Sequence, residues 1–173
     1  MNKKIFKYKD QRVAILIDTQ NLYHSARSLY NKRVNFKEVV KEALAGRQLV
    51  RAVAYVITTK AQTEKPFFEA LAKMGIEIRE RPLQEFYGGA KKANWDVGMV
   101  VDAIRFAEVV DVIVVISGDG DFISLDDYLK NKGRQVEIVA FGRSTSSRLI
   151  EVADDFIDLD ESKKFLLETK RRV

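Results

Sequence analysis

The sequence predicts an α/β fold in which helices cover both faces of a mainly parallel sheet of five to six strands. Two observations support this prediction. Short runs rich in Val, Ile and Ala alternate along the chain with segments of helical periodicity, and this alternation is typical of β-α-β units. The chain has 173 residues, 46% of them hydrophobic, so it can bury one sizeable core.

In the first half of the chain, the spacing of apolar residues assigns each segment to a strand or a helix. Residues 12–18 and 49–59 are nearly continuous apolar runs, which indicates strands buried on both faces. Residues 76–83 alternate in charge, which indicates a strand near a sheet edge. Apolar residues at helical spacing predict helices at 21–30, 35–44 and 64–75.

The second half of the chain continues the same alternation. Helical spacing predicts three further helices, and the second of them ends at Gly133. Three β-branched runs predict strands, the last of them short. The helices are expected at 94–109, 121–133 and 146–155, and the strands at 110–117, 135–141 and 156–159.

No linker or repeat interrupts this pattern, so we expect one domain over residues 1–160 and a basic C-terminal tail over 161–173. The tail has a small apolar stripe and is expected to be a solvated or frayed helix. Contact with nucleic acid or with a second copy of the chain in a homo-oligomer is the alternative. The N-terminus lacks the apolar core of a signal peptide, and no apolar run reaches the roughly 20 residues of a membrane span. We therefore expect a cytoplasmic protein.

Composition excludes several classes of chemistry. There is no cysteine, which rules out disulfides, thiolate-bound zinc and thiol catalysis. His24 is the only histidine, which disfavours histidine-rich metal sites and a Ser-His-Asp triad. Lys and Arg outnumber Asp and Glu by 30 to 25, a formal charge of +5, which is compatible with an anionic partner without requiring one.

Carboxylates follow the predicted ends of two strands. Asp18 ends the first strand, and Asp119 and Asp121 follow the fourth within the stretch SGDGDF. If these strands are neighbours, the carboxylates meet at the rim where open parallel sheets bind ligands. Asp96, near the start of the preceding helix, could join them. Such a group repels itself unless a cation intervenes, and Mg²⁺ and Mn²⁺ prefer oxygen ligands.

Each of these carboxylates also has an ordinary structural interpretation. Asp18 and Asp121 could be helix N-caps, and Asp119 could be a turn residue. Their joint occurrence at two strand ends favours the metal site. Gly118 and Gly120 would let the backbone turn sharply and approach a phosphate or a metal-bound water. The stretch lacks the pattern of an EF-hand, and the chain has no Walker A loop.

Four blocks in order resemble the NYN domain, in its LabA-like branch, within the PIN-like nuclease superfamily. They are AILIDTQNLY, KKANWDVGMVVDAIRFA, VVISGDGDFISL and STSSRLIEVADDFIDL, and the resemblance covers about residues 12–160. It implies a three-layer α/β/α Rossmann-like (PIN-like) sandwich with a divalent-metal nuclease site. The residues that match the functional positions of the family are Asp18, Asn21, Asp96, Asp119 and Asp121.

The function expected from these residues is metal-dependent hydrolysis of phosphodiester bonds, with RNA as the expected substrate. The four aspartates would bind one or two Mg²⁺ or Mn²⁺ ions, which activate a water and offset the charge of the transition state. Asn21 could orient a ligand or a phosphate without adding charge. The alternative is a non-catalytic nucleic-acid-binding or regulatory interaction module that retains the acidic rim.

Two further polar residues are secondary candidates for the site. Ser117 could orient a ligand, although packing at a strand end is the favoured interpretation. Asp102 lies six residues after Asp96, about 9 Å along a helix and on a different face. We therefore expect only Asp96 at the metal, while Asp102 pairs with Arg105 at i+3 or supports the site from behind.

Two basic stretches are candidates for substrate binding. Lys91 and Lys92 lie among aromatic residues that include Phe86 and Trp95, and this mixture suits a single strand, with phosphates on cations and bases on rings. The alternative is that the rings are packed and the charges solvated. A phosphate could also bind at a predicted helix N-terminus, although an ordinary serine cap is favoured there. The residues around that terminus are Arg143, Ser144 and Arg148.

Overall fold

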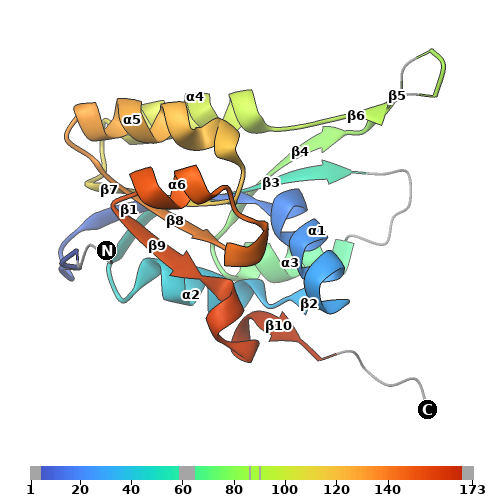
Figure 1. The fold of residues 1–173 in the computed structure, drawn as a ribbon, viewed down its shortest axis with the longest axis horizontal. Coiled ribbons are helices and arrows are strands. Elements are labelled where there is room, and N and C mark those ends of the chain that lie inside the picture. The colour runs from blue at the N-terminus through green and yellow to red at the C-terminus, as the bar shows by residue number, and fades with distance from the viewer. Residues whose placement is uncertain (1–4, 59–64, 86, 90, 169–173) are drawn as a thin grey trace.

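A six-stranded parallel sheet forms the centre of the protein (Figure 1). The computed structural model describes residues 5–58, 65–85, 87–89 and 91–168. The strand order is β4-β3-β1-β7-β8-β9, so the expected fold class is confirmed, and the edge position predicted for β4 is also confirmed. The strands are β1 (Arg12–Asp18), β3 (Gln48–Thr58), β4 (Glu77–Pro82), β7 (Val112–Ile116), β8 (Gln135–Ala140) and β9 (Asp155–Asp158).

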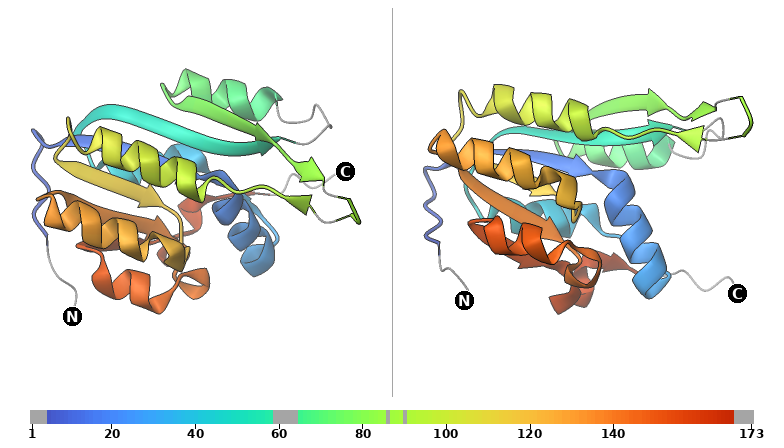
Figure 2. Two further views of the ribbon diagram at one scale, coloured as in Figure 1. Left: turned by 90° about the horizontal axis from the view of Figure 1, so that it is seen from above. Right: turned by 45° about the horizontal axis from the view of Figure 1, so that its top comes forward.

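Within the described residues, six α-helices cover the sheet, three on each face (Figures 1 and 2). One face packs against α1, α2 and α3, and the other against α4, α5 and α6. All six helices were predicted from the sequence. They are α1 (Thr19–Tyr30), α2 (Phe36–Leu44), α3 (Lys65–Lys73), α4 (Asp96–Phe106), α5 (Ile123–Asn131) and α6 (Ser147–Val152).

Strand β1 divides its side chains between the two cores. Val13, Ile15 and Ile17 enter the core beneath α1–α3, while Ala14 and Leu16 enter the core beneath α4–α6. All five are fully buried, as expected for a central strand that is covered on both faces. The strand therefore holds a fixed register, and Asp18 is its last residue at the exposed rim.

The order of the strands reverses beside β1. From β1 the chain first builds outward through β3 and β4, then returns to the other side of β1 as β7. Strand β7 pairs in parallel with β1, from Val13 opposite Val112 to Ile17 opposite Ile116. The adjacency that the metal-site hypothesis required is therefore present, at the switch point where open sheets bind ligands.

Short strands outside the main sheet were not predicted. Strands β5 (Gln84–Glu85) and β6 (Lys91–Lys92) form an antiparallel hairpin that projects beyond the end of the sheet (Figure 2). Strand β2 (Arg33–Val34) pairs with β10 (Leu166–Leu167) near the C-terminus. A strand of two residues is too short to show the alternation by which strands are recognised in a sequence.

The described part of the C-terminal tail is not the frayed helix that was expected. A single 3-10 turn at Lys163–Phe165 buries the Phe165 ring beside the core, and β10 follows. The Asn35 N–H donates to the Phe165 carbonyl at 2.8 Å. The tail therefore takes its conformation from β2 and the loop before α2. Among the described residues, no helix is both long and apolar enough to cross a membrane.

One carboxylate is buried on α5, away from the strand ends. Asp126 is 1% exposed, and its oxygens accept no hydrogen bond from the described residues. Lys130 Nζ lies 3.4 Å from Asp126 Oδ2, one helical turn away. Burial raises the pKa of Asp126 to about 6, and the positive charge of Lys130 opposes that rise only in part.

The raised pKa of Asp126 predicts a pH-dependent stability. Between its ordinary value of 3.8 and about 6, the folded state binds more protons at this group than the unfolded state. The contribution of Asp126 to the free energy of unfolding therefore falls as pH rises through this range and is level above it. We expect Asp126→Asn to be more stable than the wild type at pH 8, and similar to it at pH 4, in urea titrations.

Asp10→Asn, at an exposed position outside α5, is the control and should show no such divergence. An Asp126→Asn variant whose stability runs parallel to that of the wild type at every pH would contradict the prediction.

Candidate metal centre

Three carboxylates from two segments converge at the rim of the sheet. Asp96 is the first residue of α4, and Asp119 and Asp121 belong to the loop after β7. Each offers an oxygen within 4.8 Å of the others. Two oxygens that share one cation at about 2.1 Å per bond lie at most about 4.2 Å apart. Small side-chain rotations would therefore let these three carboxylates bind a single Mg²⁺ or Mn²⁺ ion.

Asp18 lies next to this group and is held by the fold. Its Oδ1 accepts a hydrogen bond from the Asn21 N–H at 3.1 Å, which caps α1. Its Oδ2 accepts from the Ser117 hydroxyl at 3.0 Å. The helix-cap interpretation therefore holds for Asp18, and it is compatible with a place at the rim. The mutually close carboxylates are the other three, and Asp18 is not among them.

Like charges and burial act together on this rim. The pKa of Asp96 is raised, first by burial and then by the charges of Asp119, Asp18 and Asp121. Burial also raises the pKa of Asp18, against the lowering effect of its hydrogen bonds from Asn21 and Ser117. The site without a cation therefore disfavours full ionisation, and a bound cation would remove that penalty.

Asn21 and Ser117 position the loop that carries the carboxylates. The Gly118 N–H donates to Asn21 Oδ1 at 3.0 Å, which ties α1 to the loop. The Ser117 hydroxyl is fully buried and accepts from the Asp119 N–H at 3.2 Å. Asp119 Oδ1 in turn accepts from the Asp121 N–H at 2.9 Å and caps the 3-10 turn Gly120–Phe122. These polar side chains fix the direction of the acidic loop.

The glycines of SGDGDF serve a different purpose from the one expected. Neither Gly118 nor Gly120 has a positive φ, so a sharp turn is not the reason for glycine. A Cβ on Gly118 would lie 2.6 Å from Thr145 Oγ1 and 3.0 Å from Thr145 Cα, and one on Gly120 would lie 3.1 Å from Ser146 Oγ. The glycines therefore allow the segment before α6 to pack against the acidic loop.

Thr145 and Ser146 are residues of the site that sequence reasoning missed. The Ser146 N–H donates to the Gly118 carbonyl at 3.0 Å, and the Ser146 side chain accepts from the Leu149 N–H at 3.4 Å to cap α6. The run of small hydroxyl residues in STSSR was the available signal; it predicted a serine cap at this helix start, which is present, but not the contact with the acidic loop.

Asp102 lies outside the acidic group. It is 2% exposed, accepts a hydrogen bond from the Tyr55 hydroxyl at 2.6 Å and forms an ion pair with Arg79. The predicted i+3 partner, Arg105, is 3.8 Å away. These neighbours compensate the charge of Asp102, so its place in the structure is the junction between α4 and the strands β3 and β4.

The basic and aromatic stretch around β6 divides into described and undescribed parts. Lys91 and Lys92 form β6, but their side chains, like all of Phe86, lie outside the described residues. Trp95 is packed: its indole N–H donates to the Val56 carbonyl at 2.9 Å, and the Arg81 guanidinium stacks 4.2 Å from the ring centroid. For Trp95, the alternative interpretation of a packed ring is therefore the correct one.

The second basic stretch is largely engaged within the protein. Arg143 forms an ion pair with Asp160 at 3.5 Å and lies over the Tyr30 ring. Ser144 Oγ donates to Ser25 Oγ at 2.8 Å. Arg148 is exposed on the first turn of α6. An ordinary serine cap is present here, at Ser146, and a phosphate contact at these residues stays a prediction.

Comparison with known proteins connects this geometry to a family. The model of the NYN domain matches residues 12–160. The low amplitude and bright protein LabA of Synechococcus elongatus is 27% identical over 179 residues, which cover 95% of this chain and 92% of LabA. The crystal structure of VPA0982, a protein of unknown function from Vibrio parahaemolyticus, superposes with a TM-score of 0.84 at 31% identity. That superposition covers 94% of this chain and 100% of VPA0982.

The contact of Gly118 with Thr145 predicts a graded response to added methyl groups. Gly118→Ala meets backbone at 3.0 Å and should lower the free energy of unfolding by about 1–3 kcal/mol. Gly120→Ala meets side-chain atoms and no backbone, with Ser146 Oγ at 3.1 Å and Ser146 Cβ at 3.2 Å, so it should cost less. Urea titrations of both variants check the order, and a neutral Gly118→Ala would disprove the packing role.

The repulsion among the carboxylates predicts that removing one charge stabilises the metal-free protein. In EDTA at low salt, Asp121→Asn should raise the free energy of unfolding by about 0.5 kcal/mol, since it relieves Asp96. Added salt should reduce that gain by screening. Thermal and urea unfolding provide the measurement, with Asp127→Asn as the exposed control. A loss of stability in Asp121→Asn would show that repulsion does not govern this rim.

Proposed function

This chain belongs to the NYN domain family, and from that premise we propose that it is a divalent-metal-dependent nuclease that hydrolyses phosphodiester bonds in single-stranded RNA. The observation that carries the proposal is the convergence of Asp96, Asp119 and Asp121, with oxygens within 4.8 Å of one another at the strand switch point. Nucleic acid is the substrate class that membership of a PIN-like nuclease family implies.

Each residue of the rim has a distinct part in the proposed reaction. Asp96, Asp119 and Asp121 would hold Mg²⁺ or Mn²⁺, with Asp18 as a further ligand or as a support for the ligands. When bound, the cation supplies Lewis-acid activation of water and offsets charge on the reacting phosphate. Asn21 keeps the acidic loop in place through its hydrogen bond from the Gly118 N–H.

The remaining composition supports carboxylate-and-metal chemistry. The chain has no cysteine and one histidine, so a thiol or a histidine pair is not available as the reacting group. Ser117 is fully buried and bonded to both Asp18 and the Asp119 N–H, which suits a positioning residue and not a nucleophile. The excess of five positive charges favours an anionic substrate, and the cytoplasm is the proposed location.

Cleavage assays with labelled single-stranded RNA and DNA test the proposal. We expect wild-type cleavage that requires Mg²⁺ or Mn²⁺ and is lost in EDTA. Asp119→Asn keeps an oxygen that can accept from the Asp121 N–H but removes a charged ligand, so its rate should fall at least about 100-fold. Asp127→Asn, exposed on α5, should stay within about twofold of the wild type.

Two outcomes would refute the nuclease proposal. One is a wild-type protein without metal-dependent cleavage of either nucleic acid, and the other is an Asp119→Asn variant that cuts at the wild-type rate. RNA binding that persists in Asp119→Asn, without cleavage by any variant, would instead identify a non-catalytic module. Such binding should weaken as salt rises, because phosphate contacts release counterions.

A further inference from the structure

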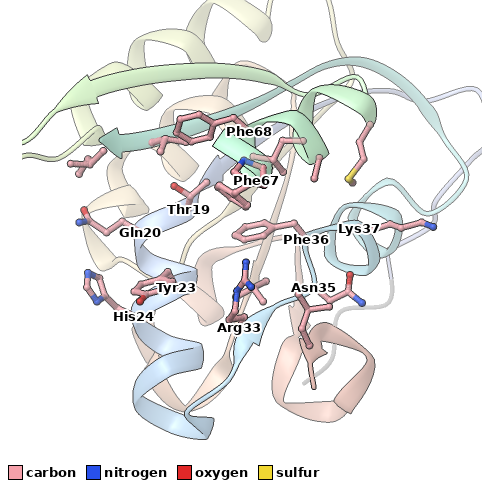
Figure 3. Close-up of a pocket in the computed structure, with 18 residues that line it drawn as sticks. Thr19, Gln20, Tyr23, His24, Arg33, Asn35, Phe36, Lys37, Phe67 and Phe68 are labelled. Atoms are coloured by element: carbon pink, nitrogen blue, oxygen red, sulfur yellow. The ribbon is translucent and has the colours of Figure 1, made fainter. Parts of the chain in front are cut away.

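A cavity of about 640 Å³ lies between α1, α2 and α3, close to β2 (Figure 3). None of the four aspartates lines it. Its volume falls within the range of roughly 300–1,000 Å³ that is usual for sites that bind small organic groups. The cavity is therefore a second concave surface, distinct from the acidic rim.

Aromatic rings from three helices line this cavity. Tyr23 comes from α1, Phe36 from α2, and Phe67 and Phe68 from α3 (Figure 3). Phe36 and Phe67 lie with ring centroids 5.3 Å apart. The three phenylalanines are only partly buried, and Tyr23 is 52% exposed. The rings therefore support the core and still present apolar surface to a flat ligand.

Cationic side chains stand at the edge of the same cavity. Arg33 and Lys37 both line it and are exposed, and neither forms an ion pair with another described residue. Proteins that bind single-stranded nucleic acids stack bases on aromatic rings and bind the phosphates with cationic side chains.

The first turn of α1 separates the cavity from the acidic rim. Thr19 and Gln20 line the cavity and directly follow Asp18. Further along, Asn21 faces the acidic loop through its bond from the Gly118 N–H, whereas Tyr23 lines the cavity. An α-helix with its side chains is about 10–12 Å across. A strand that crosses the start of α1 would therefore reach both surfaces within a few nucleotides.

We propose that this cavity binds one unpaired base of the nucleic-acid strand whose phosphate lies at the acidic rim. The inference rests on the proposed function for the identity of the strand. The base stacks among Tyr23, Phe36 and Phe67, and Arg33 and Lys37 contact the adjacent phosphates. A base held in a duplex cannot enter a concave site of this kind, so the cavity selects single-stranded substrates.

Equilibrium binding of short labelled phosphorothioate oligonucleotides tests this inference in Mn²⁺ at low salt, because the modified backbone resists hydrolysis and the cation offsets the negative charge of the rim. Ala70 is exposed on α3 and lines the cavity, so Ala70→Trp fills the space without removing a core contact. We expect Ala70→Trp and Tyr23→Ala each to weaken binding about fivefold to tenfold, the lower part of the range for base stacking. Tyr128→Ala, which removes a similarly exposed tyrosine outside the cavity, should bind like the wild type.

Abasic substitutions at each position of the oligonucleotide identify the base. At one position, loss of the base should weaken wild-type binding about fivefold to tenfold, and Ala70→Trp should then bind that abasic strand as well as the wild type does. The inference is overturned if the wild type binds none of the strands, if no abasic position matters, or if Ala70→Trp binds every strand like the wild type.

The two proposals fail in different ways. A wild type that binds with this base dependence but never cleaves in Mg²⁺ or Mn²⁺ overturns the nuclease proposal and supports the base site. A wild type that cleaves, while its binding ignores abasic positions and the Ala70→Trp substitution, overturns the base site alone.

Discussion

The buried hydroxyl of Ser117 connects the two strands on which the candidate site is built. It donates to Asp18 at the end of β1 and accepts from the Asp119 N–H after β7. The bond to Asp18 depends on the parallel pairing of β1 with β7, which sets the two strand ends side by side. Asn21 adds a second link, from α1 to Gly118. Because these bonds fix the backbone, the acidic side chains converge despite their mutual repulsion.

The rim shows how structural and chemical roles coincide in the same residues. Asp18 caps α1 and carries a charge at the rim, and Asp119 caps the following turn and belongs to the close group of three carboxylates. Capping hydrogen bonds favour the ionised carboxylate, while burial and like charges oppose it. The two effects oppose each other, and a bound cation would offset the burial and the like charges.

Helix α1 organises the surroundings of the site. Its first turn carries Asn21 toward the acidic loop and Thr19 toward the cavity lined by aromatic residues. On the other face of the sheet, α4 brings Asp96 to the rim. Asp102 on the same helix is held by Tyr55 and Arg79. One side of the sheet edge thus offers carboxylates, and the neighbouring side offers rings and cations.

Periodicity and β-branching are local properties, so the six main strands, the six helices and the positions of Asp18 and Asp119 after strands could be predicted without a structure. Which side chains meet depended on the folded chain: Ser117 links two strands, Thr145 packs against Gly118, and rings from three helices surround the cavity. The two-residue strands and the packed tail also escaped prediction. Such contacts join segments far apart in the chain, so their distances depend on how helices pack on the sheet, which no local pattern encodes.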